Sequence, residues 1–249
     1  MLILLPPSET KLPGGDGPPL RLDGLALPIL RPERATVVEA LVELSSDEDA
    51  AARVLRLSAR QRGEIAVNAA LLESPTMPAV DRYTGVLYDA LGAHALDAAS
   101  RRWLGAHVLI HSAPLGPVAA SDLIPAYRLA AGTALPGVPP LRRLWAGPVT
   151  AALAAASPRF VLDLRSEAYA ALGPVPAGID TAYVRVVTET AGGAARALNH
   201  FNKHAKGELV HALAVDRPRV TSTGTFLAWA ERTGRVARRG RGGEIDLVV

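Results

Sequence analysis

The chain opens with Met1-Leu2-Ile3-Leu4-Leu5-Pro6-Pro7-Ser8-Glu9-Thr10-Lys11, and this stretch decides the fold class. A run of apolar residues that ends at a proline pair is typical of a strand buried in a sheet. The polar residues Ser8, Glu9 and Lys11 therefore stand at the carboxyl end of a strand. In open α/β sheets this edge is where ligands usually bind.

Strand-like and helix-like segments alternate along the rest of the chain. Apolar runs and alternating patterns predict strands at 107–111, 160–164, 182–188 and 244–249. Periodic apolar faces predict helices within 32–72 and at 96–104, 141–156, 198–215 and 226–232. Thr36 and Glu39 form a capping-box signature near the start of the first helical region, whereas 112–125 has the pattern of a loop. We expect one α/β (α+β) domain over residues 1–249, with a mixed β-sheet flanked by helices.

Composition narrows the classes of function. The chain has no cysteine, which excludes disulfides, thiolate nucleophiles and zinc–thiolate sites. The net charge of +3 is compatible with nucleic-acid binding but does not diagnose it. The apolar stretch 149–156 is far shorter than the roughly 20 residues of a membrane span. We expect a cytoplasmic protein without a membrane partner.

Lysine is rare in this chain although basic residues are not. Of the 27 lysine and arginine residues, three are lysine: Lys11, Lys203 and Lys206. A lysine ammonium can lose its proton and act as a nucleophile or base, whereas an arginine stays charged. These three lysines are therefore candidate functional residues. The alternative is that they remain in this arginine-rich chain by chance.

The predicted helix 198–215 carries two of the three lysines. At about 100° per residue, one side of the helix should face the core with Phe201, Ala205, Leu209 and Ala212. The opposite side gathers His200, Lys203, His204, Gly207 and His211, and Lys206 flanks the apolar side. Four interpretations stay open: a solvated face, a site for an anion or nucleic-acid phosphate, a catalytic lysine, and a metal site at His200 and His204. No HExxH or nearby carboxylate pattern supports the metal, so we expect neither metal nor cofactor.

Two loops add further polar candidates. In the first loop, Asp122, Tyr127 and Arg128 lie within seven residues of one another. Either these side chains form part of a pocket, or Asp122 pairs with Arg128 and braces the loop. The run from Asp163 through Arg165 and Ser166 to Glu167 ends a strand and begins a helix. Ser166 is then either the N-cap of that helix or a ligand-binding group at the sheet edge.

Taken together, these segments resemble the YaaA peroxide stress resistance family, particularly its actinobacterial branch. The resemblance extends over nearly the whole chain. It rests on the opening run to Glu9 with Lys11, on Tyr83-Thr84-Gly85-Val86-Leu87-Tyr88, on Ser121-Asp122 with Pro125-Ala126-Tyr127-Arg128-Leu129, on Asp163-Leu164-Arg165-Ser166 with Tyr169, and on His200-Phe201-Asn202-Lys203 with Lys206-Gly207.

The resemblance implies a cytosolic protein with the family's α/β fold that protects against hydrogen peroxide by limiting free iron and the DNA damage it promotes. It also implies DNA binding through a helix-hairpin-helix-like element. One loop departs from the family pattern, because Leu115, Ala119 and Ala120 stand where relatives carry an aromatic residue, an arginine and a proline. The lost arginine would remove a charge-assisted anion contact, which suggests a diverged paralogue recruited to a biosynthetic pathway.

Two sets of site residues follow from the motifs and the resemblance. The catalytic candidates are Lys11, Lys203, Lys206, Asp163 and Tyr127. The candidates for ligand or anion binding are Ser8, Glu9, Tyr83, Asp122, Arg128, Arg165, Ser166, His200 and Asn202. The first hypothesis is a DNA-binding stress protein. The alternative is a lysine-dependent enzyme for a small anionic or planar, nucleobase-like substrate, in which case Lys11 should meet Lys203 or Lys206 in one pocket.

Overall fold

The central feature of the computed structural model is an eight-stranded mixed sheet in which β1 (Leu2–Leu5) lies between two parallel neighbours, β3 (Val108–Ser112) and β6 (Val161–Asp163). The structure describes residues 1–189, 195–197 and 199–249, and the side chains of 1–188 and 201–249. The strand order β4-β3-β1-β6-β7-β10-β9, with β8 paired to β7, confirms the mixed α/β class.

The sheet continues on both sides of this centre. Two further strands are parallel to their inner neighbours, β7 (Thr181–Glu189) and β10 (Ile245–Val248). Three others are antiparallel to theirs, β4 (Gly116–Ala119), β8 (Ala195–Ala197) and β9 (Ala237–Arg239). A separate two-stranded sheet pairs β2 (Met77–Pro78) with β5 (Leu123–Ile124).

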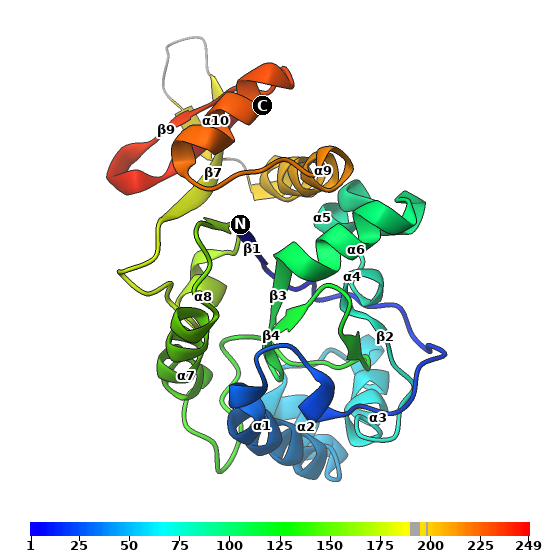
Figure 1. Cartoon of the computed structure of the whole chain (residues 1–249). Coiled ribbons are helices and arrows are strands. Elements are labelled where there is room, and N and C mark those ends of the chain that lie inside the picture. The colour runs from blue at the N-terminus through cyan, green and yellow to red at the C-terminus, as the bar shows by residue number, and fades with distance from the viewer. Residues whose placement is uncertain (190–194, 198) are drawn as a thin grey trace.

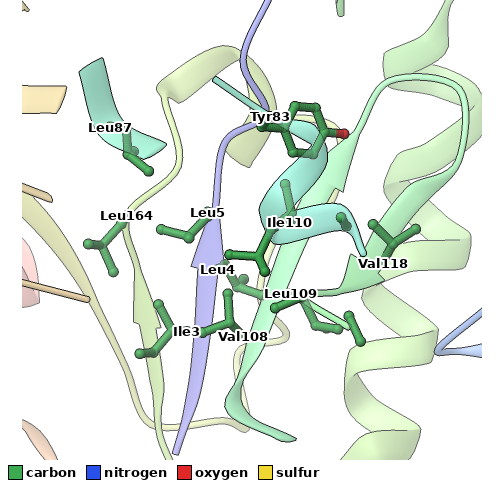
Figure 2. Close-up of a cluster of buried hydrophobic side chains, with 14 of the residues drawn as sticks. Ile3, Leu4, Leu5, Tyr83, Leu87, Val108, Leu109, Ile110, Val118 and Leu164 are labelled. Carbon is green, nitrogen blue, oxygen red and sulfur yellow. The ribbon is translucent and has the colours of Figure 1, made fainter. Parts of the chain in front are cut away.

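The opening apolar run is the middle of the core. Ile3, Leu4 and Leu5 are at most 1% exposed, and Figure 2 shows them beside side chains of β3 such as Ile110. Burying each of these large aliphatic side chains contributes about 1.5–3 kcal/mol. The sheet centre is therefore rigid, and the loop that follows Leu5 starts from a fixed point.

Helices pack on both sides of the sheet. Their bounds are α1 (Arg31–Leu44), α2 (Glu48–Val54), α3 (Gly63–Ala69), α4 (Ala79–Arg82), α5 (Val86–Leu91), α6 (Ala98–His107), α7 (Leu141–Ala156), α8 (Glu167–Ala170), α9 (Asn199–Asp216) and α10 (Thr223–Arg232). In Figure 1, α7 and α8 lie on one side of β1 and β3, and α5 and α6 lie on the other. No helix among the described residues is both long and apolar enough to span a membrane.

Two local predictions are wrong. Helix α1 begins at Arg31 with Pro32 in its first turn, so Thr36 lies inside the helix, where its hydroxyl donates to the carbonyl of Pro32 instead of capping. The segment 112–125 holds strands β4 and β5 rather than only a loop. These strands are short, and Pro117 suits the sheet edge because it has no N–H to donate.

Close packing of α5 against α9 depends on Gly207. A Cβ atom added there would lie 2.2 Å from the carbonyl oxygen of Leu87 and 2.8 Å from Cβ of Ala90. We predict that Gly207→Ala lowers the free energy of unfolding by about 1–3 kcal/mol, because the two helices must separate. Urea denaturation checks this. Gly224→Ala in α10 is the matched control: the nearest atom is 3.8 Å away, so it should stabilise by about 0.5–1 kcal/mol. Equal effects of the two changes would contradict the prediction.

Candidate functional site

A cavity of about 950 Å³ opens where β1 and β6 end. Its walls come from the loop 6–10 after β1, Leu164 and the segment 166–169 after β6, residues 183–186 of β7, the start of α5 at 85–88, and α9. Helix α9 contributes Asn202, Lys203 and Lys206. The cavity therefore lies at the carboxyl edge of the parallel strands, the place where α/β sheets usually bind ligands.

Lys206 is the buried cation of this pocket. Its side chain is 5% exposed, and Nζ donates to the carbonyl oxygen of Leu164 at 3.0 Å and lies 5.4 Å from the ring centroid of Tyr183. Burial lowers the pKa of Lys206 to about 8, with Asp163 opposing the shift and Arg185 adding to it. At neutral pH Lys206 is thus mostly an ammonium ion. Among the described residues no carboxylate forms an ion pair with it, so two of its three N–H groups are available to a ligand.

The orientation of α9 differs from the prediction. Ala205, Leu209 and Ala212 face the core as expected, but Phe201 is 64% exposed. Gly207, expected on the polar side, is buried against α5. The adjacent residue, Lys206, is buried and bonds to the carbonyl oxygen of Leu164 instead of lying at the margin of the apolar side.

The rim of the pocket carries further polar groups. Lys203 is exposed, and Asn202 is half-buried with an Oδ1 atom that has no hydrogen-bond partner in the described part of the chain. His204 pairs with Glu208 along α9 at 3.3 Å. The side chain of His200 lies outside the described residues. Among the side chains that the structure describes, no three His, Asp or Glu residues gather as a metal site.

Lys11 does not join the other two lysines. Its Nζ donates to the carbonyl oxygens of Ser8 and Glu9, at 3.0 and 3.3 Å, and lies 4.1 Å from the ring centroid of Tyr127. Burial lowers its pKa to about 8 as well, but Lys11 is not part of the pocket wall. The hydroxyl of Tyr127 is bonded at 2.7 Å to that of Tyr83, and both rings are buried. Lys11 therefore supports the loop 6–10 from behind the pocket.

Asp163 and Arg165 form a buried ion pair beneath the pocket. The guanidinium makes two bonds to the carboxylate, at 2.9 and 2.7 Å, and it also donates to Nδ1 of His111 and to the carbonyl oxygen of Gly173. Burial and the nearby Arg165 hold the pKa of His111 well below its ordinary value, so the imidazole is neutral. Arg165 is the common partner of Asp163, His111 and Gly173, and neither Asp163 nor Arg165 lines the pocket wall.

The second predicted cluster is divided between two places. Asp122 accepts from the backbone N–H groups of Ala26 and Ala119, both at 2.8 Å. Arg128 instead pairs with Glu9 at 2.6 Å. The expected brace between Asp122 and Arg128 is therefore wrong, because the backbone amides already hold the carboxylate. Glu9 and Ser8 do line the pocket, and so does Ser166, whose hydroxyl makes no capping bond to α8.

Sequence reasoning missed several residues of the pocket wall. Tyr183 and Arg185 point to it from β7, Tyr169 from α8 and Tyr88 from α5. Tyr183 and Arg185 are two residues apart in a strand, and this spacing could have indicated that they share a face. Buried Arg34 was also missed: it donates to the carbonyl oxygens of Leu115 and Pro117 and so anchors the start of β4, the strand that ends at Ala119.

The fold and the site thus define an α/β protein with a tyrosine-lined pocket at the carboxyl edge of its sheet that contains a buried lysine. The sequence profile of the family described as peroxide stress protein YaaA matches residues 1–225, and the chain belongs to this family, as its motifs indicated. A UPF0246 protein of Corynebacterium efficiens is 43% identical over 100% of both chains. A UPF0246 protein of Streptomyces coelicolor is 44% identical over 86% of this chain and 82% of its own length.

Proposed function

We propose that this YaaA-family protein acts in the cytoplasm under peroxide stress by binding a small anionic ligand in the pocket at the end of β1 and β6. The observation that carries the proposal is the buried ammonium of Lys206, which faces a cavity and bonds to a carbonyl oxygen but to no carboxylate of the described residues. A buried charge without a counter-ion is costly. An anionic ligand would offset that cost and take up the two remaining N–H groups.

The rest of the wall supports a small ligand over a polymer. Lys203 adds a second positive charge from the same helix, while Arg185 is already engaged with Glu244 and Glu167. The volume of about 950 Å³ lies within the range of small-molecule sites and is too small to admit a duplex. The hydroxyls of Ser8 and Ser166 can complete the coordination of a carboxylate or phosphate.

The pH dependence of anion binding tests this proposal. Because burial lowers the pKa of Lys206 to about 8, the ammonium is present at pH 7 and largely lost at pH 9. We predict that the affinity for glycerol 3-phosphate, measured by calorimetry, falls by about tenfold between pH 7 and pH 9. The same titration with Lys11→Met is the control and should fall equally, since Lys11 lies outside the pocket wall. Absence of binding at pH 7 would end the proposal.

DNA binding is the second candidate function, and the exposed arginines near the C-terminus favour it. Arg232, Arg239 and Arg241 are exposed around α10 and β9, which Figure 1 places at the opposite end of the molecule from α1 to α3. Such a surface predicts binding that weakens steeply with salt. An electrophoretic shift assay with duplex and single-stranded DNA at low salt tests it. Retained mobility of both DNAs at micromolar protein would exclude this candidate.

The family resemblance implies that the protein limits iron-dependent damage. In the cell, this protection would follow from ligand binding in the same pocket. A deletion strain should then hold more free iron under peroxide than its parent. The wild-type gene should restore the parental level, and a gene encoding Lys206→Met should not. Equal restoration by both genes would separate the iron phenotype from the pocket.

A further inference from the structure

We propose that Lys206 is a carbonyl-reactive amine, and that the ligand of the pocket is a small anionic aldehyde or ketone with which Nζ forms an imine. This inference rests on the proposed function, because it assigns a chemical class to the anion that the pocket binds. The geometry that carries the inference is that of a buried primary amine beside a cavity. Lys206 lines the cavity, is only 5% exposed, and has a carbonyl oxygen as its hydrogen-bond acceptor.

Three features make this amine different from an ordinary surface lysine. No carboxylate of the described residues forms an ion pair with it, and the desolvation of the buried amine outweighs the opposing effect of Asp163 on its pKa. A desolvated lysine beside other cations is the standard way to obtain a neutral amine near neutral pH, and burial does lower the pKa of Lys206 to about 8. The cavity also gives a ligand a path to Nζ, which the packed interior of a domain does not.

The neighbouring charges suit an anionic carbonyl compound. Lys203 precedes Lys206 by three residues on α9, so the two side chains are neighbours on the helix surface. Lys203 is exposed at the same pocket and can hold the carboxylate or phosphate of the ligand while Lys206 reacts. Once the imine forms and takes up a proton, it carries a positive charge close to the carboxylate or phosphate of the same ligand.

The reaction balances without an oxidant or reductant. After Lys206 releases its ammonium proton to solvent, the lone pair of Nζ attacks the carbonyl carbon and a C–N bond forms. The carbonyl oxygen then leaves as water together with the two remaining hydrogens of the amine, and a C=N bond remains. The product is an imine between Nζ and the ligand carbon, which hydrolysis reverses.

The small number of lysines makes the test specific. The full-length protein is treated with glyoxylate or glyceraldehyde 3-phosphate and cyanoborohydride, which reduces an imine to a stable amine, and the labelled peptide is identified by mass spectrometry. The chain offers only Lys11, Lys203, Lys206 and the amino terminus as amines. Lys11 is an internal control, since burial lowers its pKa to the same value of about 8 but it lies outside the pocket wall.

We expect label at Lys206 at least tenfold above that at Lys11 and Lys203, with a rate that is half-maximal near pH 8 and levels above about pH 9. Excess glycerol 3-phosphate, which has no carbonyl group, should protect Lys206. Label spread evenly over all amines, or confined to Lys203, would overturn the inference. If glycerol 3-phosphate binds by calorimetry and Lys206 stays unlabelled, the inference fails and the proposed function stands. If glycerol 3-phosphate does not bind, the proposed function fails first.

Discussion

Asp163→Asn should lower the free energy of unfolding by about 3–5 kcal/mol, because it leaves the guanidinium of Arg165 charged and buried without its counter-ion. Arg165 is fully buried, and both bonds to Asp163 are short. The neutral imidazole of His111 cannot take over the carboxylate's role. For a protein of this size, each 1 kcal/mol moves the melting temperature by about 2–4 °C. Urea and thermal denaturation at pH 7 measure the loss.

The matched control for this change is Asp23→Asn. Asp23 also pairs with an arginine, Arg31, but more than half of each side chain is exposed. Solvent screens such a pair, so its loss should cost about 0–1 kcal/mol. A loss of less than 1 kcal/mol in Asp163→Asn would show that the Asp163–Arg165 pair does not stabilise the fold next to the pocket.

Lys206→Met should weaken the binding of glycerol 3-phosphate by about tenfold to a hundredfold at pH 7, since it removes a charge-assisted contact worth about 1.5–3 kcal/mol. The unliganded variant should be no less stable than the wild type. Burial lowers the pKa of Lys206 from 10.5 to about 8, so the unfolded chain binds this proton more tightly than the folded one. The charged lysine therefore opposes folding at neutral pH, and its contribution becomes less unfavourable as the pH rises from 8 to 10.5.

Calorimetric titration measures the affinity of Lys206→Met for glycerol 3-phosphate, and thermal denaturation of the same preparation measures its stability. Lys11→Met is the matched control: it removes a lysine whose burial lowers the pKa to about 8 as well, but which bonds to the loop 6–10 and not to the cavity. A large loss of stability together with weaker binding in Lys206→Met would indicate a structural role for this lysine instead of a binding role.

Much of the fold could be predicted because its strongest signals are local. The opening apolar run is a central strand, and the loop after it reaches the pocket with Ser8 and Glu9. The segment from Asp163 to Glu167 does end one strand and begin a short helix. By contrast, β4 and β5 escaped prediction because short edge strands with proline carry little periodic signal.

The site was less predictable because side-chain contacts depend on partners far away in sequence. Arg128 meets Glu9 and not Asp122, and Tyr183 reaches the pocket from a strand with no motif. Lys11 is half-buried and Lys206 is buried, and desolvation lowers both pKa values to about 8. Sequence could not separate them, since the difference between them is which one faces a cavity.

The mixed α/β class, the central strand, the loops at its carboxyl end and the family were all predictable from local sequence patterns. Apolar periodicity, the prolines and glycines that end helices and strands, and short motifs all depend on residues close together in the chain. They can therefore be recognised without the structure. The folded packing, by contrast, pairs Asp163 with Arg165 and leaves Lys206 without a carboxylate partner among the described residues. The position of Lys206 depends on segments far apart in sequence, because Lys206 bonds from α9 to the carbonyl oxygen of Leu164, which follows β6.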